Sequence, residues 1–267
     1  MKHLLLATLM VLMTSCEGNA THTAKLEAVS YPKQMQQTPH DTLLAGIQSR
    51  IANAFVQSMM MKDGTPLQEI SVDLARHYKK EKHNLIRYWQ SYLQFYYSIF
   101  YLAYNDKENA EKEVEQAIEW MDEMKNKNSE DYALLSMLQG FSLQFKGMRA
   151  MFIGPKAKKN AQIAIALDST NPRAYYVYAS NDFYTPEQYG GGKAAEKYLK
   201  KAISLPAQKV PNNYLPSWGI EEAYELLIRL YIKKRKWDLA KKYFQEGIAT
   251  FPDSYIISRW ARRLVGR

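Results

Sequence analysis

Residues 224–252 read YELLIRLYIKKRKWDLAKKYFQEGIATFP, and this stretch decides the fold that the sequence predicts. Its first half carries large apolar side chains at the spacing i, i+3, i+4 and i+7: Tyr224, Leu227, Ile228 and Tyr231. That spacing is typical of one buried face of an α-helix. After a short basic break, a second helix is expected from Trp237, with the small residues Ala240 and Gly247 against the first helix. Pro252 ends the unit, so the stretch predicts a tightly packed helical hairpin.

The hairpin resembles a tetratricopeptide (TPR) repeat, whose pattern is W-x2-L-G-x2-Y, then A-x3-F, then P. Six positions agree with that pattern: Tyr224, Leu227, Tyr231, Ala240, Phe244 and Pro252. Two positions differ, since Ile228 stands where the family prefers glycine and Gly247 stands where it prefers alanine. The resemblance implies a helical solenoid that works by binding, because such solenoids are mainly binding surfaces.

Three earlier segments repeat the arrangement of a large–small–large first helix and a small–large–small second helix. In the first of them, twelve residues separate Ser98 from Ala110, which is the same step as in the last repeat. The middle two have steps of seventeen and sixteen, so we expect extra residues in their turns, near 148–155 and 185–192. The four repeats are predicted at about 92–127, 130–169, 171–205 and 220–252.

The predicted fold class is all-α: a TPR-like helical-hairpin solenoid with a leading helical hairpin and a C-terminal closing helix. The leading hairpin is expected at 41–91, where an Asp-Gly-Thr-Pro break interrupts a helical stripe of apolar residues. The closing helix is expected at 254–267, with Trp260 and Leu264 facing inward. Because 46% of the 267 residues are hydrophobic, one domain over 41–267 can bury a sizeable core.

The N-terminus has the features of a bacterial lipoprotein signal at 1–15. A charged start is followed by ten apolar residues and then by Thr14, Ser15 and Cys16, the only cysteine in the chain. Ten apolar residues are too few to cross a bilayer. The run before Cys16 is similar to a lipobox, in which the cysteine is lipidated and becomes the new N-terminus; the alternative is an ordinary signal peptide with an incidental cysteine.

Residues 16–40 are polar and lack apolar periodicity, so they are predicted to form a flexible tether. A second likeness concerns residues 184–195, which read YTPEQYGGGKAA. This glycine-rich helix start is similar to one in the lipoprotein T component associated with TRAP-type transporters. That likeness implies an alternative role as a small-ligand-binding accessory lipoprotein of a transport system.

The formal net charge is +9, and the basic residues fall in short clusters. The clusters are Lys79-Lys80, Lys197 with Lys200 and Lys201, the run 233–236, and Arg262-Arg263. Their scatter among acidic residues favours solvated helix faces, with a patch for anionic lipid headgroups or an acidic partner as the alternative. Nucleic acid is disfavoured by the export signal and by the lack of a recognised nucleic-acid module.

Catalytic and metal-binding patterns are weak, so the sequence predicts a non-enzyme without a cofactor or metal. His77 and Glu81 would share a helix face, but zinc normally needs three or four ligands. The run Gly190-Gly191-Gly192-Lys193 fails the phosphate-loop spacing, and a flexible turn before a helix explains it better than anion binding. No Gly-x-Ser-x-Gly nucleophile elbow is present.

In a TPR array the first helices line a concave groove, which here is predicted to be aromatic at one end and charged at the other. The groove positions by register are Tyr92, Phe95, Ile99, Leu102, Leu134, Met137, Phe141, Arg173, Tyr176, Phe183, Glu222, Glu225 and Arg229. Twenty tyrosines in the chain suit a recognition surface. The groove is either open to a partner or filled by the apolar residues of 41–91, and the sequence leaves both possibilities standing.

The predicted function is therefore a non-catalytic scaffold that binds a protein or peptide segment in the bacterial cell envelope. Lipid at Cys16 would tether it to the membrane, facing the periplasm. Aromatic residues near the groove and the glycine-rich turn are the predicted contact surface, because exposed rings need either core packing or a partner. These residues are Tyr92, Phe95, Tyr176, Phe183, Tyr184 and Tyr189.

Replacing Cys16 by serine tests the anchor. The Cys16→Ser variant should stay as unprocessed precursor and take up no labelled fatty acid, because the hydroxyl cannot form the thioether to the lipid. The measurement is incorporation of labelled palmitate in growing cells, compared with the unchanged chain. Equal labelling of both chains would contradict the lipid anchor.

Overall fold

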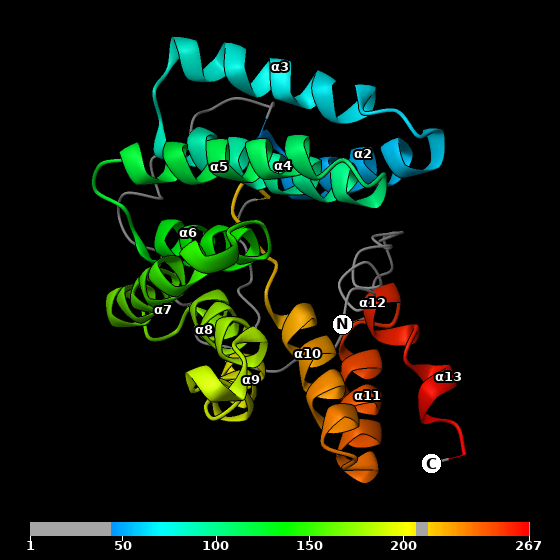
Figure 1. The fold of residues 1–267 in the computed structure, drawn as a ribbon. Coiled ribbons are helices and arrows are strands. Elements are labelled where there is room, and N and C mark those ends of the chain that lie inside the picture. Colours follow the sequence, from blue (N-terminus) through cyan, green and yellow to red (C-terminus); the bar gives the residue numbers. More distant parts are fainter. Residues whose placement is uncertain (1–43, 207–212, 267) are drawn as a thin grey trace.

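The computed structural model describes residues 44–206 and 213–266, so Cys16, the signal and the tether lie outside the described residues. Within these ranges the chain forms helices and no strand (Figure 1). Consecutive helices pack as antiparallel hairpins, and the chain is an all-α helical-hairpin solenoid. The hairpins are α2 (Ile47–Met61) with α3 (Thr65–Lys80), α4 (Asn84–Ala103) with α5 (Lys107–Glu123), α6 (Ser129–Ser142) with α7 (Ala150–Leu167), α8 (Pro172–Tyr184) with α9 (Ala195–Ser204), and α10 (Ile220–Lys233) with α11 (Trp237–Thr250).

Side-chain caps set several of the helix starts. Asp106 accepts a hydrogen bond from the amide of Asn109 at 3.1 Å and begins α5. Asn128 begins α6 with a capping box, and Asn171 caps α8 directly before Pro172. Such caps satisfy amide groups that have no partner inside the helix, at about 1 kcal/mol each. Local sequence therefore specifies these helix starts through contacts within the same segment.

Small residues let the two helices of each hairpin lie close together. Ala110, Ala161 and Ala240 are fully buried at the interfaces of the second helices. A Cβ added to Gly247 would lie 3.3 Å from the Cβ of Tyr224, so α11 meets α10 at this glycine. Ser98, at the small position of α4, donates a hydrogen bond to the carbonyl of Ala110 at 2.5 Å. The small residues that the sequence predicts at the helix interfaces are thus the residues at which these hairpins pack.

The first repeat starts earlier than its predicted boundary at 92. Helix α4 begins at Asn84, because the imidazole of His83 accepts the amide hydrogen of Leu85 at 3.1 Å and caps it. Two added turns bury Tyr88 and Trp89 completely. The leading hairpin consequently ends at Lys80. Residues 84–91, which the sequence predicts to lie in that hairpin, belong to α4.

The extra residues of the middle repeats have two different structures. In the second repeat most of the expected turn is helical, since α7 already begins at Ala150 and contains Pro155. In the third, the 3-10 helix η5 (Glu187–Tyr189) and a glycine turn lead to α9. The carboxylate of Asp182 accepts hydrogen bonds from the amides of Ala194 and Ala195, each at 2.8 Å, and so fixes the start of α9.

The closing segment is two short helices rather than one. They are α12 (Tyr255–Ser258) and α13 (Ala261–Leu264), with Ser254 capping the first through the amide of Ile257 at 3.1 Å. Ile257 and Leu264 are buried against the last hairpin, whereas Trp260 is only half buried. A break between the two helices lets both apolar side chains reach that hairpin.

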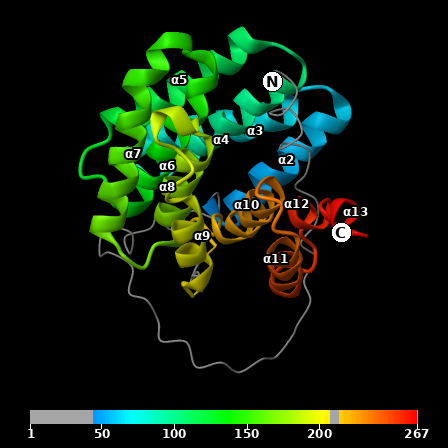
Figure 2. The same ribbon diagram turned by 60° about the horizontal axis from the view of Figure 1, so that its bottom comes forward.

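The hairpins follow a curved path that brings the end of the chain back toward its start. Figure 1 shows α2 to α5 as an upper layer, with α6 to α9 below them and α10 to α13 beside these. Figures 1 and 2 both show α10 and α12 on the side of the molecule where α2 lies, away from α7. The curvature leaves a space that is bordered by the first and last parts of the solenoid.

Residues 213–219, called here the 213–219 connection, lead into α10 and touch three earlier helices. The amide of Ser217 donates to Gln48 of α2 at 2.8 Å, and the indole N–H of Trp89 donates to the carbonyl of Tyr214 at 2.8 Å. The guanidinium of Arg173 donates to the carbonyl of Trp218 at 3.1 Å. These bonds fix the point from which α10 departs.

Arg173 also makes a buried, two-pronged ion pair with Glu130. Its Nε and Nη2 lie 2.5 Å from the two carboxylate oxygens, and its side chain is 1% exposed. Gly219 passes directly over this arginine with φ of 109°, and an added Cβ there would lie 2.7 Å from Cγ of Arg173. A side chain at position 219 would therefore collide with the ion pair and strain the backbone.

A pair of glycine substitutions tests this contact. Gly219→Ala should lower the free energy of unfolding by about 1–3 kcal/mol, through the unfavourable φ and the collision with Arg173. Gly154→Ala, within α7 and with no heavy atom within 4 Å of the added Cβ, should instead be neutral or stabilise by up to about 1 kcal/mol. Chemical denaturation measures both. Equal effects of the two changes would contradict the role of Gly219.

Candidate binding cavity

A cavity of about 160 Å³ lies where the first and last parts of the solenoid meet. We call it the aromatic cavity. It is bordered by α2, α4, α6, α8, the 213–219 connection, α10 and the closing segment, elements that Figure 2 shows drawn together. Its lining residues are Phe55, Tyr92, Phe95, Tyr96, Ile99, Met137, Tyr176, Tyr184, Trp218, Glu222, Glu225, Leu226, Arg229, Ile256 and Arg259.

Aromatic rings form the larger part of the wall and hold each other in place. Trp218 stacks on Tyr92 with 6.2 Å between ring centroids, and it meets Tyr176 edge-on at the same distance. The indole N–H of Trp218 donates to the hydroxyl of Tyr88 at 2.8 Å. Phe55 of α2 packs edge-on against Tyr96 at 5.1 Å. Offset and edge-on pairs of this kind are the preferred arrangements of rings, so the wall is preformed.

The opposite end of the cavity is charged. The carboxylate of Glu225 accepts hydrogen bonds from Arg259 at 2.8 Å and from the indole N–H of Trp260 at 3.1 Å. Arg229 lies 3.7 Å from the other carboxylate oxygen, and it donates its shorter bond, at 2.6 Å, to the hydroxyl of Tyr184. Two guanidinium groups thus share the one carboxylate of Glu225 beside the rings.

Burial keeps most of the other titratable groups of the cavity uncharged. It raises the pKa of Tyr92, Tyr96 and Tyr176, so their phenols stay protonated at neutral pH. Burial, reinforced by the neighbouring charge of Glu221, also raises the pKa of Glu222 to about 7. Although Glu222 is only half buried, its carboxylate is turned inward and accepts the amide hydrogen of Gly219 at 2.6 Å. The negative charge of Glu222 is therefore much reduced near neutral pH.

Of the six predicted contact residues, the structure brings four together around the aromatic cavity. Tyr92 and Phe95 come from α4, and Tyr176 and Tyr184 come from α8. Tyr184 keeps 48% of its surface exposed while its hydroxyl points to Arg229. Five further predicted groove positions also line the cavity: Ile99, Met137, Glu222, Glu225 and Arg229.

Six predicted positions do not line the cavity: Leu102, Leu134, Phe141, Arg173, Phe183 and Tyr189. Phe183 is half buried with its ring 5.4 Å from the guanidinium carbon of Arg229, and it does not line the cavity. Tyr189 lies on η5 and is 75% exposed. Arg173 was assigned to the groove but is buried in its ion pair with Glu130, because the side chain turns between α6 and the 213–219 connection. Leu134 is fully buried in the core.

Six lining residues were not among the predicted positions. Two of them, Tyr96 and Leu226, lie inside the regular repeats, next to the predicted Phe95 and Glu225. The other four, Phe55, Trp218, Ile256 and Arg259, lie in the leading hairpin, the 213–219 connection and the closing segment, outside the regular repeats. A register carried from repeat to repeat has no position for these four. The aromatic and apolar composition of 41–91 was the one signal, and Phe55 shows that the leading hairpin forms part of the wall.

Residues 44–206 and 213–266 contain no group of three His, Cys, Asp or Glu side chains arranged to hold a metal ion. Over the same part of the chain, no helix has both the length and the apolar character of a membrane span.

Fold and cavity together define a helical-hairpin solenoid with one preformed aromatic recess. No protein-family model matches the chain, and no curated protein sequence matches it. Membership of the TPR family is thus not confirmed, although the helical hairpins agree with the expected fold. Among solved structures, the chain is similar to the HusA haemophore from Porphyromonas gingivalis, with 24% identity over 68% of this chain and 94% of that chain, and a TM-score of 0.49. A likeness at this level supports no assignment of family or ligand.

The raised pKa of Glu222 predicts a specific dependence of stability on pH. The carboxyl binds its proton more tightly in the folded chain, at a pKa of about 7, than in the unfolded chain, where the usual value is 4.5. Ionisation therefore opposes folding, and stability is lost as pH rises from about 4.5 to about 7. Glu222→Gln, which stays neutral, should make Tm fall less over this range.

Thermal melts between pH about 5 and about 8 measure the effect, and the difference in Tm between variant and parent should grow with pH. The groups that face Glu222 are Glu221, Arg173 and the three buried tyrosines, and all of them remain in the variant. Asp131, whose pKa burial raises to about 7, contributes equally to both chains. Exposed Glu187→Gln is the control, and parallel melting profiles for Glu222→Gln and the parent would contradict the prediction.

Proposed function

We propose that this chain is a non-catalytic binding protein that holds a peptide or protein segment at the aromatic cavity. The observation that carries the proposal is the preformed ring wall beside Arg229, whose short hydrogen bond goes to a phenol. An apolar or aromatic side chain of the segment would enter the recess, and the flanking backbone would lie along its open edge. Recognition of this kind concentrates affinity in one buried anchor surrounded by weaker contacts.

The volume of the cavity limits what enters it. A cavity of about 150 Å³ lined by apolar side chains holds one benzene molecule. The aromatic cavity, at about 160 Å³, therefore suits one ring or one branched aliphatic side chain. A folded domain does not fit inside it, so a larger partner would have to present a single side chain.

Charge at the cavity favours an acidic group next to that anchor. Arg229 is only 11% exposed on its side chain, and its 2.6 Å bond goes to a neutral phenol rather than to a carboxylate. A guanidinium carries five N–H donors, and those that face a carboxylate form stronger hydrogen bonds than those that face a neutral phenol. A carboxylate of the bound segment beside its apolar anchor would accept such a bond from Arg229.

A second candidate function is binding of a small apolar acid, as an accessory protein of a transport system. The observation that favours it is the small volume of the recess, about 160 Å³, with Trp218 in its wall. Small-ligand sites are commonly apolar recesses with a few placed polar groups. Both candidates use the same residues and differ in what lies outside the cavity.

The proposed setting is the bacterial cell envelope, with the chain tethered through lipid at Cys16 and facing the periplasm. Support for it is the signal-like start followed by the only cysteine of the chain. The tether of 16–40 would let the solenoid reach partners away from the membrane surface.

A display experiment tests the function and its residues. The chain, reconstituted in phosphatidylcholine nanodiscs, is used to select random peptides, and their affinities are measured by calorimetry. We expect selected peptides to carry an aromatic or branched apolar residue beside an acidic one. Tyr184→Ala should weaken them at least tenfold, because it removes a ring from the cavity wall that contacts the apolar anchor.

Tyr189→Ala is the matched control, since this exposed tyrosine lies five residues away and does not line the cavity. Affinity unchanged by Tyr184→Ala would contradict binding at the aromatic cavity. An equal loss in both variants would instead favour the glycine-rich turn as the contact surface. If no peptide is selected while 3-phenylpropionate binds and Tyr184→Ala abolishes it, the small-ligand candidate replaces the first.

A further inference from the structure

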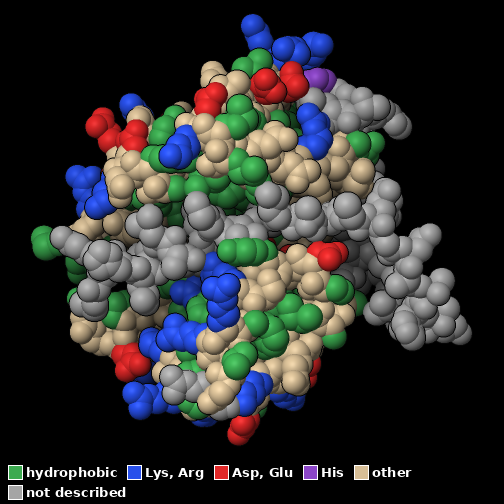
Figure 3. All heavy atoms as spheres, turned by 90° about the vertical axis from the view of Figure 1, so that its right-hand side faces the viewer, with side chains coloured by type: hydrophobic (Ala, Val, Ile, Leu, Met, Phe, Trp, Pro, Cys, Tyr) green, Lys and Arg blue, Asp and Glu red, His purple; other side chains and the backbone are tan. Residues whose placement is uncertain are grey.

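A second hollow lies at the C-terminal end of α10, whereas the aromatic cavity is lined by that helix between Glu222 and Arg229. Its volume is about 480 Å³, and it is lined by Ile232, Lys233, Arg235, Trp237 and Arg263. In Figure 3, which shows the side of the molecule where α11 and α13 lie, Lys and Arg side chains gather in the lower half. Among the described residues, no Asp or Glu lines the hollow. The fold thus brings together two basic clusters that are separate in the sequence, 233–236 and Arg262-Arg263.

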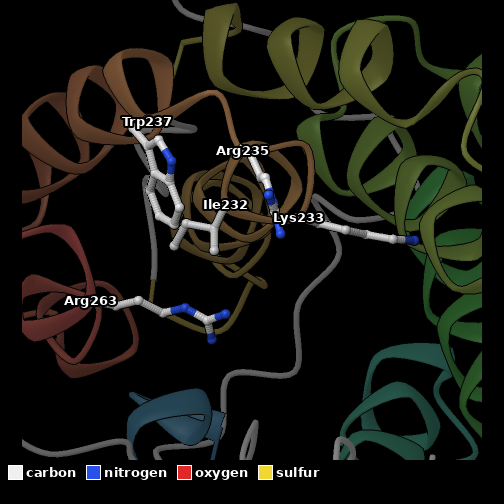
Figure 4. Close-up of a pocket in the computed structure, with 5 residues that line it drawn as sticks. All are labelled: Ile232, Lys233, Arg235, Trp237 and Arg263. Atoms are coloured by element: carbon white, nitrogen blue, oxygen red, sulfur yellow. The ribbon is translucent and has the colours of Figure 1, made fainter. Parts of the chain in front are cut away.

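The two arginines extend into the same open space. Figure 4 shows Arg235 from the α10–α11 turn and Arg263 from α13 reaching into the hollow, with Ile232 and Trp237 forming an apolar side between them. Lys233 points toward the neighbouring helices, where its ammonium lies 5.5 Å from the centre of the Phe183 ring. In the described part of the chain, none of these three cations forms an ion pair with a carboxylate.

The turn itself does not require an arginine at position 235. Arg235 has φ of 54° in the left-handed region, and its amide donates to the carbonyl of Ile232 at 3.1 Å. The α4–α5 turn has the same geometry, with Asn105 at φ of 62° and its amide 3.1 Å from the carbonyl of Leu102. Asparagine is the usual non-glycine residue for this conformation. Arginine is less suited to it, so backbone preference does not explain Arg235.

We propose that this hollow binds the phosphate group of an organic phosphate ester. Planar guanidinium groups bind phosphate oxygens in pairs, and a doubly charged anion offsets the mutual repulsion of cations that share a space. The volume exceeds that of inorganic phosphate and falls in the range of small-molecule sites. Ile232 and Trp237 would contact the organic part of the ester. The site is independent of the aromatic cavity and of what binds there.

Two sources could supply this chemistry, a lipid headgroup or a soluble metabolite, and the experiment separates them. The chain in phosphatidylcholine nanodiscs is titrated by calorimetry with glycerol 3-phosphate and with dihexanoyl phosphatidic acid. Dihexanoyl phosphatidylcholine is the zwitterionic control. Binding of the phosphatidic acid alone identifies a lipid headgroup site, and comparable binding of both anionic probes identifies a site for soluble phosphate esters.

Two variants and one matched control decide whether the arginines form the site. Arg235→Asn gives the turn its preferred residue, so it should weaken phosphate binding at least tenfold while leaving Tm unchanged or higher. Arg263→Gln should weaken it to a similar extent. Arg262→Gln removes the same charge from the neighbouring position, which does not line the hollow, and should change affinity less than twofold. The proposal is overturned if neither anionic probe binds, or if Arg262→Gln weakens binding as much as Arg263→Gln does.

Discussion

The ion pair between Arg173 and Glu130 constrains the rest of the architecture. It joins α8 to α6, and through the carbonyl of Trp218 it also fixes the 213–219 connection. Burying two charges is costly, and removing one partner of such a pair typically destabilises by about 3–5 kcal/mol, so the pair specifies one arrangement of these three segments. Gly219 packs directly against Arg173, so the ion pair also fixes the position at which α10 begins.

That placement gives the aromatic cavity its mixed character. Helix α4 supplies rings whose phenols burial keeps neutral, while α10 supplies Glu222, Glu225 and Arg229 from the opposite side. Neither helix has a binding site alone. Trp218 completes the wall because the ion pair holds its backbone and the hydroxyl of Tyr88 holds its indole. The recess therefore forms only in the folded chain, where segments more than a hundred residues apart in the sequence come together.

The sequence was sufficient for the features that depend on local spacing. The helical hairpins and the small-residue register of Ala240 and Gly247 follow from helical periodicity, and most of the groove positions follow from carrying that register between repeats. Features that depend on departures from the repeat could not be predicted in this way. The early start of α4 depends on a histidine cap, the helical form of 150–156 contradicts the usual meaning of Gly-Pro, and Arg173 is buried because Glu130 lies across from it.

The meeting of the two ends has a consequence for how such a chain can evolve. Phe55 of α2 shares one recess with Ile256 and Arg259 of the closing segment, so the first and last units are neighbours. Open solenoids gain and lose units by duplication and deletion, since each unit contacts only the next. Here an inserted or deleted hairpin would separate the two halves of the recess. The recess therefore requires the present number of units, whereas changes in the turns and on the outer surface would leave it intact.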